Sequence, residues 1–288
     1  MNLIDVKQLS SLKNLRFVAK TVVEGFLYGY HKSPYTGINI EFSEYRPYSF
    51  GDELKNIDWK LWGKTDRLYV KKFEEETNMR VWFLLDSSKS MFFTGSDEIS
   101  KIFFAKAICA ALSYIFLHQQ DSVGIADFSD KINNIIPIAL KSGQFARIIN
   151  FLTDLNCGGK TDMDKTFSYF SHIASRRGLI IIISDFLEKK ENIIRALNYF
   201  KSKKNEIIVF HIFSPDEKNF PYRQEMLFID PETGEKIHEN GENIRKNYIQ
   251  YFNENVDDIQ KICHEKKIKF KSISTSDDIV KVLGEVFR

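Results

Sequence analysis

The strongest chemical signal in this sequence is a cluster of oxygen-bearing side chains that follows an apolar run. Leu85 closes the run, and Asp86, Ser88 and Ser90 come next at alternate positions. One carboxylate and two hydroxyls from a single tight turn are hard oxygen ligands, which suit Mg²⁺. The spacing therefore predicts a cradle for a divalent cation.

Two later segments carry matching groups. Thr161 follows a pair of glycines, and Asp185 comes just after the apolar run 179–183. In an open parallel sheet, ligands bind at the carboxyl ends of the strands, so we expect these segments to meet the first one there. The predicted metal ligands are Asp86, Ser88, Ser90, Thr161 and Asp185. The expected ion is Mg²⁺, with Mn²⁺ or Ca²⁺ as substitutes.

The elements that would position these loops begin near residue 79, where β-branched runs alternate with stretches of helical spacing. Runs that are apolar throughout suit a sheet covered on both faces. The order predicts an α/β fold with a doubly wound, mostly parallel sheet in a Rossmann-like three-layer sandwich. The expected strands are 81–85, 123–128, 179–183, 207–213 and 268–273, and the expected helices include 145–152, 163–174, 193–200, 244–263 and 279–286.

One further segment, 96–119, is apolar almost all round, which favours a helix pressed deep against the sheet. Its longest apolar window, 102–117, is interrupted by Lys106 and is shorter than the ~20 residues of a membrane span. We therefore expect a buried helix and no membrane span. Segments 224–229 and 235–238 flank a five-residue loop and predict a β-hairpin, placed as a surface insertion near 222–240.

The first 78 residues differ in character from the rest. Residues 8–28 have helical spacing, and 35–75 is rich in aromatic, glycine and charged residues with short strand-like pieces at 39–42 and 68–73. We expect a small helical and β-rich subdomain, 1–78, followed by the main domain, 79–288. Within the subdomain, a structural role is favoured over a second binding surface, with the Trp59 and Trp62 rings buried.

The three loops together resemble a von Willebrand factor A-like domain with a metal-ion-dependent adhesion site. In such domains two serines and a threonine contact the ion, and two aspartates act largely through bound water. The resemblance implies these roles for Ser88, Ser90 and Thr161, and for Asp86 and Asp185. It also implies that an Asp or Glu of a protein partner completes the coordination of the ion.

The N-terminal part contains a series of short motifs: Glu41-Phe42, Arg46-Pro47-Tyr48, Gly51-Asp52, Ile57-Asp58-Trp59, Arg67-Leu68-Tyr69-Val70 and 73–76. These motifs resemble the signature of the bacterial family called domain of unknown function 58. Lys55 stands where the family has an arginine, and Gly63-Lys64 replaces an Ala-Arg pair. Members commonly accompany AAA+ ATPases of the MoxR type, which implies an adaptor or assembly factor for such a machine.

Three other interpretations remain open at this point. Asp86, Ser88 and Ser90 could form a turn that caps a helix, and Asp185 could be a helix cap as well. Asp86 could instead be the nucleophile of a Mg²⁺-dependent phosphohydrolase, although the second acid expected two residues later is Ser88, and Lys160 is the one candidate for a phosphate clamp. A structural interaction domain without metal is the third. We favour a protein-binding module over an enzyme.

Composition restricts the partner and the compartment. Lysine plus arginine total 41 against 39 acids, a net charge of +2, which gives no bulk attraction for nucleic acid. The three cysteines have no metal-ligand or disulfide spacing, and the N-terminus lacks the pattern of a signal peptide. The expectation is a cytoplasmic protein whose partner is another protein.

Overall fold

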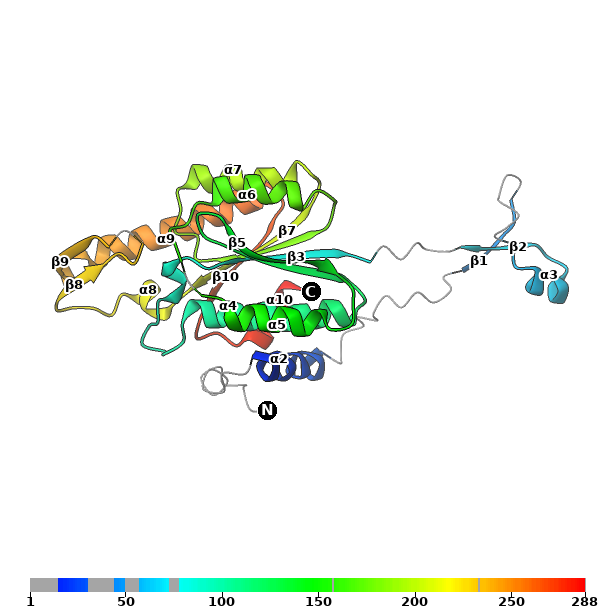
Figure 1. Ribbon diagram of the computed structural model, residues 1–288, viewed down its shortest axis with the longest axis horizontal. Coiled ribbons are helices and arrows are strands. Elements are labelled where there is room, and N and C mark those ends of the chain that lie inside the picture. The colour runs from blue at the N-terminus through cyan, green and yellow to red at the C-terminus, as the bar shows by residue number, and fades with distance from the viewer. Residues whose placement is uncertain are drawn as a thin grey trace. The chain divides into compact units, whose positions relative to one another are not determined.

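The computed structural model describes residues 15–30, 44–49, 57–72, 78–156, 158–232 and 234–287. Contacts divide the chain into two units, one of residues 1–32 with 79–288 and the other of 33–78. The larger unit has a central sheet between two layers of helices (Figure 1).

The central sheet has six strands in the order β10-β7-β6-β3-β4-β5. Neighbouring strands are parallel, except that β5 runs antiparallel to β4 at one edge. Since β3 lies between β6 and β4, the loops that follow β3 and β6 leave the same edge of the sheet side by side. The strands are β3 (Arg80–Asp86), β4 (Ser122–Phe128), β5 (Ile132–Ala139), β6 (Leu179–Ser184), β7 (Glu206–Phe213) and β10 (Lys269–Ser274).

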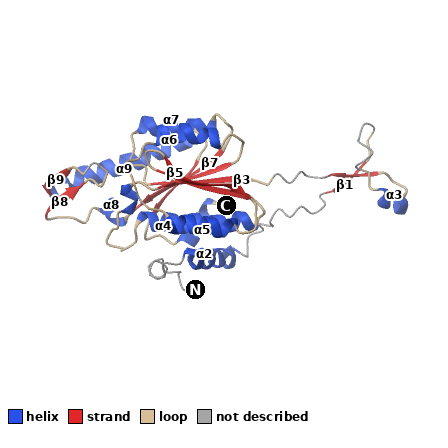
Figure 2. Ribbon diagram, in the orientation of Figure 1, coloured by secondary structure: helices blue, strands red, loops and turns tan. Residues whose placement is uncertain are grey.

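Side chains of alternate residues along β3 enter separate cores on the two faces of the sheet. Val81 and Phe83 pack with α4 (Lys101–His118), α5 (Gln144–Asp154), α10 (Ile279–Val286) and α2 (Leu15–Tyr30). Trp82 and Leu84 pack with α6 (Met163–Ile173), α7 (Lys190–Lys201) and α9 (Gly241–Glu265). Figure 2 shows the two helical layers on either side of the strands. This is the expected doubly wound, mostly parallel sheet in a three-layer sandwich.

The five predicted parallel strands are present within two residues of their expected bounds, whereas β5 was not expected. Its sequence contains two asparagines and Pro137, which are uncommon in strands, and it is only partly buried. Proline is tolerated there because β5 is an edge strand. In the neighbouring pair, Gly124 lies opposite Trp82, and a Cβ on Gly124 would come within 2.6 Å of the Trp82 ring.

Helix α4 begins at Lys101, five residues later than the apolar pattern suggested, because the Ser100 side chain accepts a hydrogen bond from the Phe103 backbone and caps the helix. By length and composition α4 is the one helix in the described residues that could span a membrane, and 67% of its span is buried inside the protein. It packs between the sheet and α2, as expected for a core helix.

The N-terminal helix α2 packs against α4 and α10, and so belongs to the larger unit by contacts. The expected boundary after residue 78 coincides with the division of the chain, but the helix expected within the small subdomain lies on the main domain instead. Apolar Val18 and Ala19 explain this, since both are fully buried in the main core. Residues 8–14 of the predicted helix lie outside the described residues.

The small unit contains β1 (Glu44–Pro47) paired antiparallel with β2 (Tyr69–Lys72), and the short helix α3 (Trp59–Thr65). Asp58 caps α3 by accepting a hydrogen bond from the Leu61 backbone at 3.1 Å. The expectation that Trp59 and Trp62 bury their rings is wrong, because they are 57% and 44% exposed and contact each other edge to face. The predicted strand 39–42 lies outside the described residues.

The predicted hairpin is present as β8 (Glu225–Ile229) and β9 (Lys236–Asn240), antiparallel to each other. It is inserted between the short helix α8 (Pro215–Asn219) and α9, and it projects beside the start of α9 (Figure 1). Phe228 of β8 stacks on Phe220, which anchors the hairpin to the main unit.

Candidate functional site

Asp86 ends β3 and has both carboxylate oxygens engaged. Its Oδ1 accepts a hydrogen bond from the Ser88 backbone at 2.9 Å, and its Oδ2 accepts one from the Ser184 hydroxyl at 2.5 Å. Burial, and then the charge of Asp185, raise the pKa of Asp86 to about 7 against the opposing effect of these hydrogen bonds. The hydrogen bonds therefore fix the orientation of the carboxylate, and no positive charge is among the causes that set its pKa.

Ser88 and Ser90 are buried, with their Oγ atoms 3.0 Å apart. They belong to the turn before and within a 3₁₀ helix, η2 (Lys89–Phe92), but the Ser88 side chain makes no capping hydrogen bond to it. The helix-cap interpretation therefore fails for Ser88. Adjacent oxygens around an octahedral ion with ~2.1 Å bonds lie about 3 Å apart, so the two hydroxyls have the spacing of neighbouring ligands.

Asp185 follows β6 and forms a buried ion pair with Lys101 at the start of α4. The Lys101 Nζ lies 2.8 Å from Asp185 Oδ2 and 2.6 Å from Oε1 of Glu217 in α8. Burial alone would raise the pKa of Asp185, but the charge and hydrogen bond of Lys101 lower it, and a hydrogen bond from Ser90 acts in the same direction. Asp185 is thus held ionised at the edge of the site.

Lys101 has no exposed surface and neutralises part of the acid at this edge. Burial alone would lower its pKa, but the charges of Asp185 and Glu217 raise the pKa above its ordinary value. Neither Lys101 nor Glu217 was expected from the sequence. An isolated lysine at the start of an apolar helix resembles a surface lysine, so no local signal could have identified it.

The backbone after Asp185 explains why its side chain faces Lys101 rather than capping a helix. Phe186 has φ +50°, a conformation that bulky residues rarely adopt, and its ring is fully buried. Its N–H donates to the Ser184 hydroxyl at 2.9 Å. Helix α7 starts at Lys190 with Lys189 as its N-cap, so Asp185 does not cap it and this alternative interpretation of Asp185 fails.

Hydrogen bonds join three of the predicted residues, Asp86, Ser88 and Ser90, to one another and to Ser184. Asp185 is hydrogen-bonded to Lys101, which also binds Glu217, and Ser90 lies close enough to Asp185 to lower its pKa.

Thr161 lies in a neighbouring loop, which Gly158 ties to the first one by donating its N–H to the Ser87 carbonyl at 3.1 Å. Within the part of the chain that the structure describes, no hydrogen bond joins Thr161 to the other four predicted residues. Instead its hydroxyl and its backbone N–H donate to the two oxygens of Glu232, at 3.3 and 3.5 Å. Glu232 lies in the β8–β9 turn and was not among the predicted site residues.

The residues present fit a hard divalent cation by their donor chemistry. The described residues hold no group of three or more His, Cys, Asp or Glu side chains placed for a metal, so hydroxyl oxygens must supply part of any shell. Ser88 and Ser90 supply them at ligand spacing. Burial, with the charge of Asp185 adding, raises the pKa of Asp86, so a cation beside this carboxylate would favour its ionised form.

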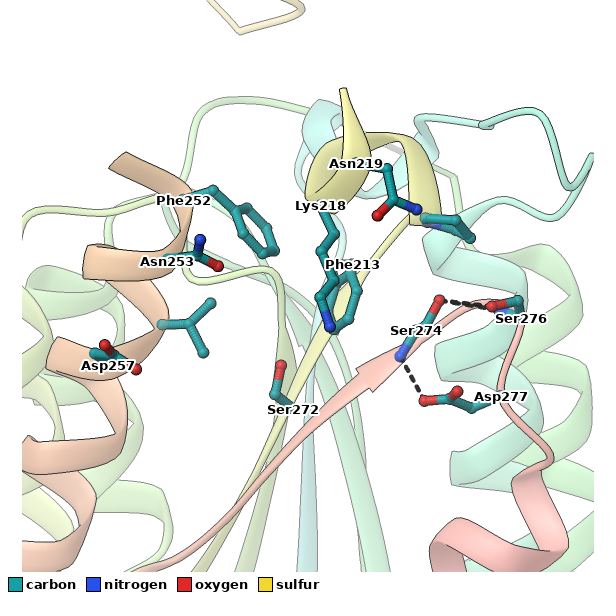
Figure 3. Close-up of a pocket in the computed structure, with 12 residues that line it drawn as sticks. Phe213, Lys218, Asn219, Phe252, Asn253, Asp257, Ser272, Ser274, Ser276 and Asp277 are labelled. Carbon is teal, nitrogen blue, oxygen red and sulfur yellow. Dashed lines mark hydrogen bonds between the residues drawn. The ribbon is translucent and has the colours of Figure 1, made fainter. Parts of the chain in front are cut away.

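A pocket of about 490 Å³ lies at the carboxyl ends of β7 and β10 and contains none of the predicted site residues. Figure 3 shows its lining, in which Ser274 is hydrogen-bonded to Ser276 and Asp277. The Lys218 ammonium there lies 5.8 Å from the centre of the Phe213 ring. The cluster described above, at the ends of β3 and β6, is therefore separate from this cavity.

The chain is similar to several solved structures, all at low identity. An aerotolerance-related membrane protein from Bacteroides fragilis matches with 17% identity and a TM-score of 0.49, over 72% of this chain and 98% of that one. BatB from Bacteroides thetaiotaomicron matches with 16% identity and a TM-score of 0.46, over 73% and 97%. The VWA domain of SpRpn10 matches with 13% identity and a TM-score of 0.42, over 73% and 95%.

Sequence comparison finds relatives that match this chain over most of their length and most of its own. Uncharacterized proteins from Mycobacterium bovis and Mycobacterium tuberculosis are 24% identical over 235 residues, which is 80% of this chain and 73% of each relative. The family model described as protein of unknown function DUF58 matches residues 44–257, which include every predicted site residue and Glu232. The chain therefore belongs to the DUF58 family.

Proposed function

We propose that this chain is a cytoplasmic protein-binding module whose contact with its partner depends on a divalent cation. Asp86, Ser88, Ser90, Thr161 and Asp185 would hold the ion, and an Asp or Glu of the partner would complete its coordination. The proposed biological role is that of an adaptor or assembly factor for a MoxR-type AAA+ ATPase, which rests on the family resemblance.

One observation carries the proposal. Two hydroxyl oxygens 3.0 Å apart lie between two buried carboxylates, with Ser88 on the Asp86 side and Ser90 on the Asp185 side. Charged groups are buried in proteins only where counter-charges or ligands compensate them. Lys101 already pairs with Asp185 and Glu217, so Asp86 is the carboxylate left to be compensated by a cation.

The surrounding residues define what each part of the site does. Ser184 and the Ser88 backbone hold Asp86 in one orientation, and Lys101 does the same for Asp185. A bound Mg²⁺ would supply positive charge and a position open to a carboxylate. Because these groups are held by neighbours, little ordering is required when the ion binds, which favours affinity.

The hydrolase alternative is disfavoured by the environment of Asp86. A nucleophilic carboxylate needs an oxygen that can reach a substrate, but Asp86 is fully buried and both of its oxygens accept hydrogen bonds. The acid two residues later that would assist leaving-group chemistry is absent, because Ser88 occupies that position.

Calorimetric titration tests the metal site. Mg²⁺ and Mn²⁺ would be added to the wild type, to Asp86→Asn, and to the control Asp257→Asn, which changes an exposed acid lining the separate pocket. We expect saturable binding in the wild type and the control and its loss in Asp86→Asn. Equal heats in all three proteins would remove the metal site.

Affinity capture tests the partner. The full chain and Asp86→Asn would be immobilised and exposed to purified MoxR-type ATPase from the same genome, with Mg²⁺ or with EDTA. Retention by the wild type in Mg²⁺ alone supports the proposal, and retention that ignores EDTA contradicts its metal dependence. Metal-dependent hydrolysis of p-nitrophenyl phosphate that disappears in Asp86→Asn would favour the hydrolase instead.

A further inference from the structure

The contact between Glu232 and Thr161 joins two parts of the chain that are 71 residues apart in sequence. Oε1 of Glu232 accepts from the Thr161 hydroxyl, and Oε2 lies 3.5 Å from the Thr161 N–H. Both oxygens of the carboxylate are thus directed at one of the five predicted ligands. The hairpin insertion thereby brings an acid to the site from outside the three loops.

Hydrogen bonds join the described residues of the turn that carries Glu232. Asp230 accepts a hydrogen bond from the Glu232 N–H at 2.8 Å, and its own N–H donates to the Glu235 carbonyl at 2.9 Å. Gly234 has φ +75° and donates to the Asp230 carbonyl. Such a side-chain-to-backbone turn fixes the direction of the next residues, so the position of Glu232 is set by the hairpin itself.

The base of the hairpin is fixed as well. Gly241 donates its N–H to the Gln224 carbonyl, and a Cβ at Gly241 would lie 2.4 Å from the Tyr222 carbonyl oxygen, so the two ends of the insertion are in close contact. Phe220 stacks on Phe228 and also contacts the Tyr248 ring of α9. Glu232 is therefore held over the site from both ends of its hairpin.

Glu232 adds negative charge near Asp185. It is half-buried, and burial, with the charge of Asp185 adding, raises the pKa of Glu232. A bound cation would favour the ionised form of this carboxylate. The 3.3 Å between Glu232 Oε1 and Thr161 Oγ1 is close to the ~3 Å spacing of neighbouring ligands around a small ion.

We propose that Glu232 is an internal acid ligand of the site, which takes the position that the partner's carboxylate would otherwise fill. This inference rests on the proposed metal-dependent function and specifies how the site is regulated. In the resting chain the β8–β9 turn covers the ion, and a partner binds by displacing it. The partner chemistry that fits is an Asp or Glu presented together with contacts that move the hairpin.

Mn²⁺ is the probe for this proposal, used with the full chain. Its dissociation constant would be measured by electron paramagnetic resonance, and its bound waters by the relaxation of water protons. The variants are Glu232→Gln and the matched control Glu239→Gln, an exposed acid on the same hairpin. We expect Glu232→Gln to weaken Mn²⁺ binding about tenfold and to raise the water relaxivity by the contribution of one extra water, with the control unchanged.

The other outcomes separate the two proposals. Mn²⁺ binding that depends on Asp86 but is equally tight and equally hydrated in Glu232→Gln overturns the internal ligand and leaves the metal site standing. Tighter binding in Glu232→Gln likewise overturns it, because Glu232 would then only hold Thr161 away from the ion. Failure of the wild type to bind Mn²⁺ overturns both.

A metal-free readout guards against misfolding of the variant. In EDTA, Glu232→Gln should accelerate hydrogen exchange at the Thr161 amide, because the charged acceptor facing that N–H is lost. Exchange in the β3 core should be unchanged in the same sample. Faster exchange throughout the sheet would show a folding defect, and Glu232→Asp, which keeps the charge on a shorter side chain, would then replace it.

Discussion

Lys101 Nζ lies 2.8 Å from Asp185 Oδ2, with the lysine side chain fully buried and the aspartate side chain 3% exposed. The pair joins the start of α4 to the end of β6, and Glu217 completes it from α8 at 2.6 Å. An ammonium group therefore already compensates one side of the candidate site, and a divalent ion would act on the Asp86 side.

Replacing Lys101 with methionine should destabilise the protein by about 3–5 kcal/mol, because it leaves Asp185 and Glu217 buried without their counter-charge. Urea unfolding with and without Mg²⁺ measures the effect. The metal should restore more stability to Lys101→Met than it adds to the wild type, since it supplies the missing charge. As a control, Lys190→Met breaks the exposed pair with Asp258 and should change the stability far less than Lys101→Met does.

Thr161 offers a test of the hydroxyl ligand by two conservative changes. Thr161→Val keeps the shape and removes the oxygen, so Mn²⁺ affinity should fall by about tenfold or more. Thr161→Ser keeps the oxygen and should retain most of the affinity. Titration of both variants in parallel decides the matter, and equal affinities would show that Thr161 supplies no ligand.

Two buried groups, His211 and Asp86, should change the stability of the metal-free protein in opposite directions as the pH falls. Burial is the largest cause that lowers the pKa of His211 from 6.5 to about 4, with the charge of Asp185 opposing and that of Lys101 adding. The unfolded chain then binds a proton that the folded chain refuses, and stability falls by about 3 kcal/mol as the pH drops from 6.5 to 4. Asp86 acts in the reverse direction, since its folded pKa is raised from 3.8 to about 7, so its contribution is lost as the pH rises through that range.

Single variants separate these two contributions in EDTA. Asp86→Asn removes the group whose effect on stability opposes that of His211. The unfolding free energy of this variant should therefore decrease steeply from pH 6.5 to pH 4. His211→Asn should show the reverse slope, with greater stability at the acidic end. Parallel pH profiles for the two variants would exclude this assignment.

Gly124 should tolerate no side chain. A Cβ there would lie 2.6 Å from the Trp82 ring and 2.8 Å from the Ile138 nitrogen, so Gly124→Ala should cost about 1–3 kcal/mol through overpacking. Gly158→Ala is the matched change, because nothing lies within 4 Å of the new Cβ. Thermal unfolding should distinguish them, and a neutral Gly124→Ala would mean that β4 and β5 can separate without loss.

The parallel strands, and the positions of Asp86 and Asp185 at the ends of two of them, could be predicted because their signals in the sequence are local. An apolar run followed by an aspartate predicts both a buried strand and a polar group at its carboxyl end, as at Asp86 and Asp185. Strand β5 escaped prediction because its pairing with β4, rather than its composition, makes it a strand. The burial of Trp59 was expected from the size of its ring, but the side chain is 57% exposed, because burial depends on which segments pack over a residue.

The residues that complete the site were not predictable from local pattern. Lys101, Glu217 and Glu232 come from a helix start, a five-residue helix and a hairpin turn. Each reaches the site through long-range packing, with partners 71 to 116 residues away in the chain. The spacing of apolar residues predicts the secondary structure of a segment. These contacts depend instead on which segments the fold brings together.

The hairpin that carries Glu232 is attached to the body of the protein at both ends, through α8 and α9. An acid on such a tether competes at an effective concentration that dilution does not change, typically of millimolar order. A free acidic peptide would therefore compete poorly for the ion at micromolar concentrations. If Glu232 is the internal ligand, a partner would have to contact the hairpin as well as supply its own carboxylate, so the insertion would restrict which proteins can bind.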